Sequence, residues 1–428
     1  MAIRKAAFLT LVFSLLLSPI FAGRGQSAEP PLVLAELIEE ALRASPEILA
    51  AGSRVLASRH RIPQAMSLPD PMLMFGYQNE GFDKITLGEE PNSQGMFSLS
   101  QMFYFPGKRA LKGEMATRDS EGLQALQDAT RRKVVTRVKE LYYDLFLSYR
   151  VVELIQDRMA LFGKVEEAAL ARYSSGTGTQ QEVVMAQTEK YMLLEREEMQ
   201  RQKIEAFQAM LNAAVGRDVD TPLGRPAETP PTGFDVTPEE LNALVRANSP
   251  EVKWKEKMVQ AAEAKLQMAN KEYYPDFTLS AGYFPRTKGL LDMWNLTATI
   301  NLPIFYKSKQ DQAVAEASAG LSEAKRELKA TEYMLSSGVR DSYSMVKAAN
   351  RLMVLYRDGL LPKATQDVQL GLTGYISGKT EALTTITRIK ALLDAETLYW
   401  IQRTEREKAI ARIEAVTAPA ALPGGDQK

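Results

Sequence analysis

The sequence predicts a mainly α fold: a long α-helical coiled-coil barrel, together with four strands per subunit that contribute to a transmembrane β-barrel, built by internal duplication. Three observations support this prediction. About 65 residues after position 108 contain no proline and carry an apolar heptad pattern. Four short segments alternate between apolar and polar side chains. The second half of the chain repeats the first at an offset of about 204 residues.

The longest predicted helix runs from 108 to about 173. Alternating steps of three and four, with Ser148 as the exception, connect its apolar positions, which are Val134, Val138, Leu141, Leu145, Val152, Ile155, Met159 and Phe162. A second predicted seam lies between about 308 and 373. Its apolar residues recur every seven positions and are Val314, Leu321, Leu328 and Leu335. Such seams pack helices side by side. At 1.5 Å per residue, about 65 residues give a rod of roughly 100 Å.

Matching landmarks define two copies of one unit. The motif Ser45-Pro46-Glu47 returns as Ser249-Pro250-Glu251, and the Tyr173-Ser174-Ser175-Gly176 turn returns as Tyr375-Ile376-Ser377-Gly378. In both Ser-Pro-Glu motifs the serine is predicted to cap a helix that begins at the proline. The predicted domains are a first structural repeat over 29–215, a Pro-rich linker over 216–236, a second repeat over 237–416 and a disordered tail over 417–428.

Residues 1–28 are predicted to be a secretory signal peptide. Arg4 and Lys5 precede an apolar run from 6 to 22, and small and polar residues follow it. A membrane anchor is the alternative, but about 17 apolar residues are at the short limit for spanning a bilayer. The chain has 53 basic and 53 acidic residues, so its charge indicates no nucleic-acid partner. Cysteine is absent, which excludes disulfides and thiolate metal sites.

The clearest strand covers 295–301, where asparagine and threonine alternate with leucine, alanine and isoleucine. Trp294 is in phase with the apolar set, and the segment 277–283 alternates in the same way. The first copy has a weaker pattern, in which 73, 75 and 77 are apolar and Ser98 and Ser100 are polar. An ordinary sheet with one buried face would show the same period.

Four strands are too few for a closed barrel, because about eight is the practical minimum. Open strand edges are not tolerated in lipid. If these strands cross a membrane, several copies of the chain must share one barrel. Two copies supply eight strands and three supply twelve. An eight-stranded barrel is filled by its own side chains, so an open duct favours three or more copies.

No group of residues indicates an active site, a metal site or a cofactor site, so none of these is expected. His60 is the only histidine and lies in the charged stretch Arg59-His60-Arg61, where it is predicted to be solvated. The phosphate-loop-like run from Ser377 to Thr380 lacks the glycine required six residues before the lysine. The methionines near the strands are predicted to face lipid or a neighbouring strand rather than to bind a soft metal. They are Met72, Met74, Met96 and Met102.

Together these features resemble the TolC-like outer-membrane efflux family over about residues 32–416. The marks of this resemblance are the duplicated unit, the opening 34–47 with its Ser-Pro-Glu, the two Tyr-x-x-Gly turns, and the strand exits Phe105-Pro106-Gly107-Lys108-Arg109 and Leu302-Pro303-Ile304-Phe305. The segments 68–74 and 105–108 are similar to those of one branch of this family, the branch that serves heavy-metal efflux pumps of the resistance-nodulation-division type.

The resemblance implies a homotrimer whose 12-stranded barrel lies in outer-membrane lipid and whose helices extend across the periplasm. It also implies two protein partners, a periplasmic adaptor and an inner-membrane efflux pump of the resistance-nodulation-division type. The implied function is passive export, and the heavy-metal branch makes metal ions the candidate cargo. The strands and turns themselves select no cargo, so drug or protein export stays open.

The resemblance further assigns roles to the periplasmic tips, at 173–178 and 374–379. The turn residues that would dock the adaptor are Tyr173, Gly176, Gly178, Tyr375 and Gly378, with glycine supplying positive φ. The periplasmic iris that closes the tunnel would contain Glu182, Thr384, Thr387 and Lys379. Threonine stands at 384 and 387 where relatives often carry aspartates, so their acidic ring is missing at these positions.

Glu182 keeps an acid at the corresponding position of the first copy. We predict that Glu182 pairs with a donor near the second turn, namely Tyr375, Lys379 or Thr380, and helps to hold the tunnel shut. The alternative is an ordinary solvated helix acid.

Two other classes of protein remain open. A soluble periplasmic coiled-coil scaffold or pump adaptor would also contain long helices and strands, but it would lack a duplicated pair of two-faced hairpins. A periplasmic enzyme with a helical domain would need a convergent catalytic cluster, and only carboxylate chemistry stays open for it.

Overall fold

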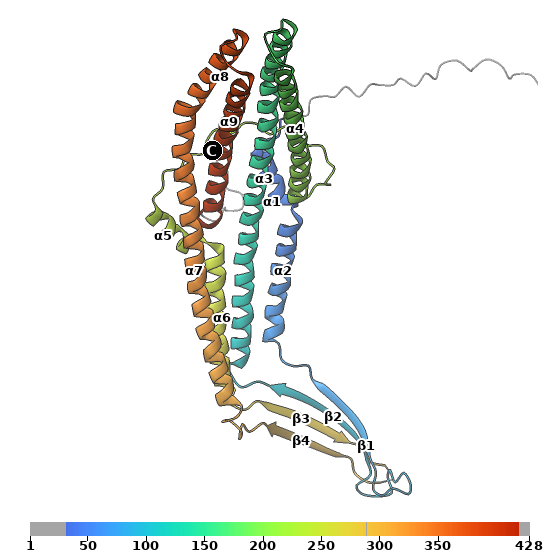
Figure 1. Ribbon diagram of the computed structural model, residues 1–428. Helices are drawn as coiled ribbons and strands as arrows, with labels where there is room; N and C mark the ends of the chain where they lie inside the picture. The colour runs from blue at the N-terminus through green and yellow to red at the C-terminus, as the bar shows by residue number, and fades with distance from the viewer. Residues whose placement is uncertain (1–30, 288, 419–428) are drawn as a thin grey trace, which may run out of the picture.

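The computed structural model describes residues 31–287 and 289–418 and shows an elongated molecule, with a helical rod at one end and a sheet at the other (Figure 1). The predicted signal peptide, 1–28, lies outside the described residues, as does all of the predicted tail after 418. The first half contains α1 (Leu34–Ala44), α2 (Pro46–Met66), β1 (Met72–Gln78), β2 (Gln94–Phe103), α3 (Lys108–Ser174) and α4 (Gln180–Val215). The second half contains α5 (Pro238–Asn248), α6 (Pro250–Lys271), β3 (Phe277–Phe284), β4 (Met293–Ile300), α7 (Gln310–Val354), the π-helical turn η1 (Leu355–Leu360), α8 (Leu361–Ile376) and α9 (Ala382–Thr417).

The helices that follow the two Ser-Pro-Glu motifs begin at Pro46 and Pro250, as predicted. Ser249 caps its helix, because its hydroxyl accepts a hydrogen bond from the Val252 amide at 3.4 Å. Ser45 makes no side-chain capping bond, so the predicted cap there is wrong. Proline at the first helical position needs no amide partner, so it can set the start without a serine cap.

The long helix α3 has 67 residues, which corresponds to about 100 Å of rod. Its predicted seam is the buried one: Val138, Leu145 and Phe162 have no exposed surface. The matching helix of the second copy is not continuous as predicted, because η1 interrupts it between α7 and α8. Pro362 follows this turn and has no amide to continue the regular ladder. Within the described ranges, no helix has an apolar stretch long enough to cross a membrane.

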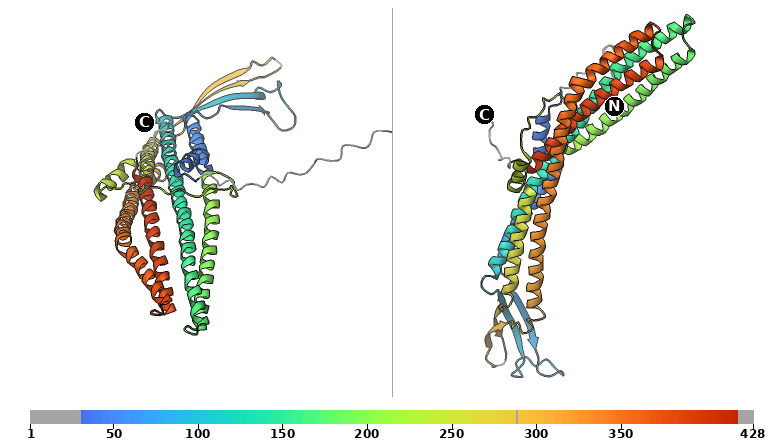
Figure 2. Two further views of the ribbon diagram at one scale, coloured as in Figure 1. Left: turned by 90° about the horizontal axis from the view of Figure 1, so that it is seen from above. Right: turned by 60° about the vertical axis from the view of Figure 1, so that its left-hand side comes forward.

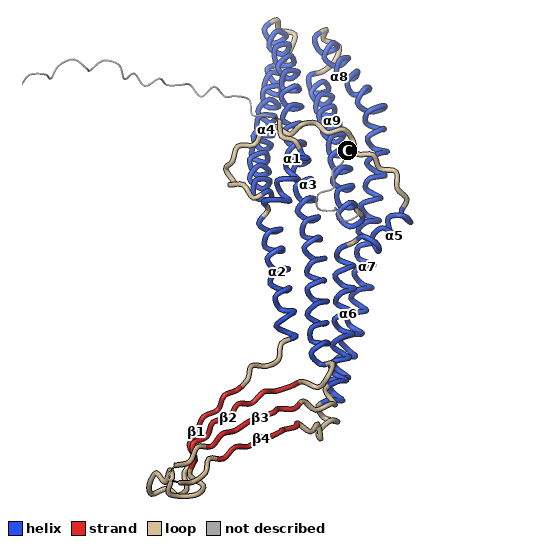
Figure 3. Tube along the Cα trace, turned by 180° about the vertical axis from the view of Figure 1, so that it is seen from behind, coloured by secondary structure: helices blue, strands red, loops and turns tan. Residues whose placement is uncertain are grey.

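Helices and strands follow the same lateral order. The four strands form one antiparallel sheet in the order β1-β2-β3-β4 (Figure 3). Next to the sheet, α2 packs on α3, α3 on α6, and α6 on α7. The molecule therefore has two matching lateral edges, one formed by β1 and α2 and the other by β4 and α7.

The sheet has two chemically different faces. Its register aligns Leu99 with Ala281 and Ala281 with Leu296 on one face, which also carries Phe75 and Trp294, 72% and 79% exposed. On the other face Ser100 aligns with Ser280 and Ser280 with Thr297. The first face suits lipid and the second suits water, which is the alternation of a membrane strand.

The strand methionines lie on the polar face, so of the two expected surroundings, lipid or a neighbouring strand, the register favours the neighbouring strand. Met72 and Met74 are opposite Ser100 and Ser98, and Met96 and Met102 share the face of these serines. Strand parity alone decides this placement, because successive side chains alternate between faces. The first hairpin looked less regular in sequence because methionine occupies positions that serine and threonine hold in the second.

Three apolar clusters hold the rod together, and the rod bends along its length (Figure 2). The largest cluster joins α3 and α4 to α8 and α9 near the tips. A second packs α1 against α3 and α4, where the Tyr142 hydroxyl donates to the carbonyls of Leu32 and Ala227. A third joins α5, α7 and α9. The second cluster and the bonds of Tyr142 thus hold the segment after α4 against the middle of the rod.

Candidate gate at the helical tips

Two tight turns form the tips of the rod. Gly176 and Gly378 have φ of 71° and 74°, the left-handed conformation expected from the sequence. In the first turn the amides of Thr177 and Gly178 donate to the Arg172 carbonyl, and in the second those of Lys379 and Thr380 donate to the Gly374 carbonyl. Both helix ends are therefore closed in the same way.

A partly buried hydrogen bond joins the two tips. The Tyr375 hydroxyl donates to Oε2 of Glu182 at 2.9 Å, across a sequence distance of 193 residues. Tyr375 has no exposed surface. The predicted contact between Glu182 and a donor near the second turn is therefore present, and Tyr375 is the donor.

Arg172 completes this contact and was not predicted from the sequence. Its guanidinium donates to the Tyr375 carbonyl at 3.2 Å and lies 5.2 Å from the centre of the tyrosine ring. Its Nε is 3.7 Å from Oε2 of Glu182. The signal was a difference between the copies, since Arg172 aligns with Gly374 when Tyr173 is aligned with Tyr375.

The environment of Tyr375 keeps its phenol protonated. Burial, followed by the hydrogen bond to Glu182 and the charge of that carboxylate, raises the pKa of Tyr375 to about 12, although Arg172 opposes the shift. The tyrosine is therefore a donor throughout the physiological range. Glu182, an acceptor when ionised, is the complementary partner.

The other predicted iris residues do not gather around Glu182. Thr384, Thr387 and Lys379 are exposed, and the Thr387 hydroxyl donates to a carbonyl of its own helix, that of Leu383. Tyr173 is 50% exposed, whereas its second-copy counterpart is fully buried. The two copies thus contribute different groups to the tips.

Ion pairs and apolar packing continue the contact along the two helical hairpins. Arg158 of α3 and Glu396 of α9 form a two-bond pair with an Nε–Oε2 distance of 2.9 Å. Lys390 of α9 donates to Glu189 of α4 at 3.0 Å. With the tip cluster between them, these pairs fix the α8/α9 hairpin against the α3/α4 hairpin.

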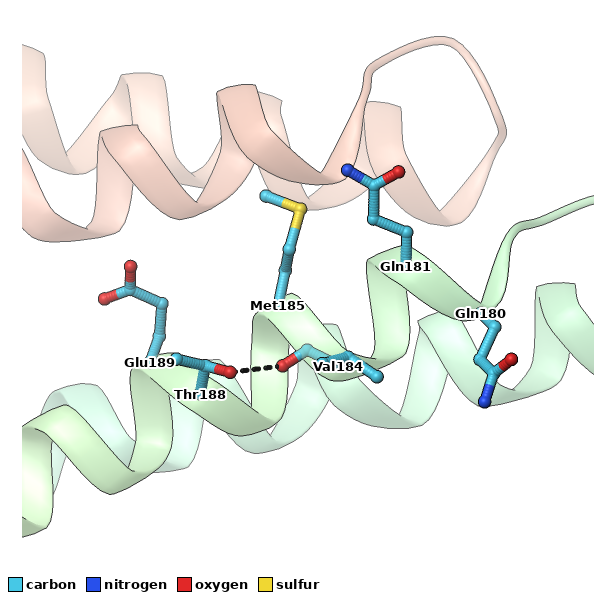
Figure 4. Close-up of a pocket in the computed structure, with 6 residues that line it drawn as sticks. All are labelled: Gln180, Gln181, Val184, Met185, Thr188 and Glu189. Atoms are coloured by element: carbon cyan, nitrogen blue, oxygen red, sulfur yellow. Dashed lines mark hydrogen bonds between the residues drawn. The ribbon is translucent and has the colours of Figure 1, made fainter.

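A groove of about 400 Å³ borders the tip beside the start of α4 (Figure 4). Met185 points from α4 toward the second hairpin, while Gln180 points away from it. The other lining residues are Gln181, Val184, Thr188 and Glu189. All of these lining residues belong to α4, and they are both apolar and polar.

The sheet has two different faces and open edges, and a long helical rod carries it. A polar contact joins the tips of this rod. These features define a channel-forming subunit of the outer membrane. The chain belongs to the outer membrane efflux protein family, whose sequence model matches residues 37–217 and 241–417. It is therefore an outer-membrane efflux protein and not an enzyme, and its fold is that of solved outer-membrane proteins.

Known proteins agree with this assignment. The chain is 23% identical over 401 residues to the cobalt-zinc-cadmium resistance protein CzcC of Cupriavidus metallidurans, covering 89% of this chain and 88% of the relative. The outer-membrane protein VceC of Vibrio cholerae shares the fold, with a TM-score of 0.78, 20% identity and coverage of 90% and 96%. CusC also shares it, with a TM-score of 0.76, 14% identity and coverage of 90% and 92%.

Proposed function

We propose that three copies of this chain form one export duct in which their sheets close a 12-stranded barrel. The observation that carries this proposal is the pair of matching open edges, β1 with α2 and β4 with α7. In lipid each edge needs a partner strand, and a second copy offers one of the correct length. Each copy would contribute two equivalent units, 29–215 and 237–416, joined by the linker 216–236.

The duct would work as the outer part of a tripartite pump. A periplasmic adaptor would dock at the tip turns, which contain Tyr173, Gly176, Gly178, Tyr375 and Gly378, and in the groove beside α4. An inner-membrane pump of the resistance-nodulation-division type would supply the energy for export, because a passive duct has no energy source of its own. The groove at the tip supports this placement because it lies where a helical hairpin could pack.

We further propose that Glu182, Tyr375 and Arg172 form the latch of a periplasmic gate. Their contact joins the two hairpins of one copy at the tip, where release would let α8 and α9 move away from α3 and α4. The exposed residues Lys379, Thr384 and Thr387 would line the closed iris without an acidic ring.

Heavy-metal cations are the proposed cargo. The support is the relative CzcC, whose name describes resistance to cobalt, zinc and cadmium. Deletion of the gene should lower tolerance to these cations and leave tolerance to organic drugs unchanged. Lower drug tolerance with normal metal tolerance would instead assign the duct to a drug pump.

A further inference from the structure

A small polar cavity lies where the sheet meets the rod, and none of the functions above uses it. Its volume is about 260 Å³, and residues from three segments line it: Lys108, four residues within 272–276, and seven residues within 301–310. Each segment sits directly at the helical end of a strand or at the start of a long helix. The cavity therefore belongs to the periplasmic end of the membrane-spanning sheet.

Aromatic and basic side chains mark the same level of the molecule as a lipid head-group region. Phe105 stacks on Tyr274 with ring centres 4.5 Å apart, and the Lys271 ammonium lies 5.6 Å from the Tyr274 ring. Phe103 stacks on Phe277 at the strand ends. Aromatic girdles of this kind lie at membrane interfaces.

The cavity contains a buried hydrogen-bond acceptor without a partner. Gln310 is only 6% exposed, and its Oε1 has no hydrogen-bond partner among the described residues. The Nε2 of the same side chain donates to the Glu272 carbonyl at 3.5 Å. A buried acceptor of this type is costly unless a donor reaches it.

Most of the cavity's charge is already paired. Lys108 is almost completely buried and lies 3.0 Å from Asp276 and 3.6 Å from Glu272. Its ammonium also donates to the Tyr274 carbonyl at 2.9 Å. One lysine thus faces two carboxylates, so one negative charge is left over, and it is accessible at Glu272, the more distant and more exposed of the two. Exposed Lys309 is a positive group at the same cavity.

We propose that this cavity binds the phosphoethanolamine head group of a phospholipid from the periplasmic leaflet of the outer membrane. The ammonium would donate to Oε1 of Gln310 and to the Glu272 carboxylate. The phosphate would lie at Lys309 and the positive end of the α7 helix dipole. Acyl chains would lie on the exposed apolar side chains of the rim, which are Leu302, Ile304 and Phe305.

The unpaired acceptor selects ethanolamine over choline. A choline head group has the same phosphate and charge but no N–H, so it leaves Oε1 of Gln310 unpaired. The inference rests on the outer-membrane location and is independent of the cargo and the gate. Because residues 301–309 join β4 to α7, the lipid would lie beside the edge that is proposed to meet the next copy.

Reconstitution of the full chain in nanodiscs tests the proposal. One arm contains phosphatidylethanolamine with phosphatidylglycerol, and the other contains phosphatidylcholine with the same phosphatidylglycerol fraction. Native mass spectrometry after detergent release should find one phosphatidylethanolamine per chain and about tenfold less phosphatidylcholine retained. Equal retention of the two lipids by the wild-type protein would overturn the proposal.

Gln310→Leu should remove the preference for ethanolamine, whereas Gln312→Leu, two residues further along α7, should keep it. If Gln310→Leu does not fold, Glu272→Gln provides the second variant, because it removes the carboxylate that faces the ammonium. Retention of the full preference by Gln310→Leu, or by Glu272→Gln where that variant is used, would also overturn the assignment.

Discussion

The Tyr375 hydroxyl and the Glu182 carboxylate are 2.9 Å apart at the tip of the rod, although 193 residues separate them in the chain. This contact joins the two helical hairpins at their free ends. This contact and the bond from Arg172 to the Tyr375 carbonyl must both break if the hairpins separate there. A latch of this kind should control opening without affecting the fold of the sheet.

Removal of the latch should open the duct. Hydrogen bonds to charged groups contribute about 1.5–3 kcal/mol, so Glu182→Ala or Tyr375→Phe should shift the open-to-closed ratio about 10- to 100-fold. Single-channel recordings in planar bilayers measure this shift. Tyr173→Phe is the matched control, because Tyr173 is the exposed counterpart of Tyr375. If conductance does not change in either latch variant, Glu182 is an ordinary helix acid with no role in closing the tunnel.

The latch should also respond to alkaline pH. The pKa of Tyr375 is raised to about 12 in the closed tip, mainly by burial and then by Glu182, whereas an exposed tyrosine has a pKa of about 10. Because the closed state holds the proton more tightly, its advantage is complete below pH 10 and is lost as the pH rises toward 12. Open probability should rise in that window. Tyr375→Phe should abolish the rise, and a rise that persists in this variant would assign it to other groups.

A buried ion pair in the middle of the rod should contribute to stability. Burial lowers the pKa of Lys408, but hydrogen bonds to Asp144 and Glu405 outweigh this effect and raise it overall. Asp144→Ala leaves Lys408, which is only 7% exposed, with Glu405 as its one acidic partner. This substitution should destabilise the fold by about 2 kcal/mol.

Thermal unfolding followed by circular dichroism measures this loss. Asp128→Ala removes an exposed pair with Arg131 and should change stability by less than about 0.5 kcal/mol. Equal effects of the two substitutions would contradict the role given to Asp144.

The two faces of the sheet should tolerate charge differently. Leu296→Lys places an ammonium on the lipid face and should cost about 2–4 kcal/mol near the bilayer centre. Thr297→Lys, at the neighbouring position on the polar face, should be accepted. Urea unfolding in lipid vesicles compares the two variants. A larger loss for Thr297→Lys would mean that the faces have been assigned the wrong way round.

Much of this fold is visible in the sequence because its signals are local and periodic. The alternation from 295 to 301 predicts β4, and the heptads from 134 to 162 predict the buried side of α3. The Tyr-x-x-Gly turns and the helix starts at Pro46 and Pro250 follow from backbone restrictions on single residues. Each of these features depends on neighbours close in the chain.

The features that sequence reasoning missed depend on contacts between distant segments. Arg172 acts by lying against Tyr375, and no local pattern at 172 predicts that neighbour. The π-helical turn at 355–360 is an exception, because Pro362 directly after it is a local signal that the prediction of one continuous helix overlooked. The serine motifs look alike, yet only Ser249 caps its helix through its side chain. The polar-face position of Met74 needed the strand register.

The central claim is that the open edges β1 and β4 of different copies pair with each other. The chain has no cysteine, so introduced cysteines are the only thiols present. Within one copy β1 and β4 are three strand spacings apart, roughly 14 Å, which is too far for a disulfide. Met74→Cys can be combined in turn with Asn295→Cys, Thr297→Cys and Thr299→Cys, all on the same face of the sheet.

Oxidation of these double variants in the outer membrane, followed by non-reducing electrophoresis, tests the claim most directly. The account predicts dimer and trimer bands for at least one pair, with the trimer as the largest covalent species. Monomer alone for every pair, from protein that is folded and located in the membrane, would contradict it.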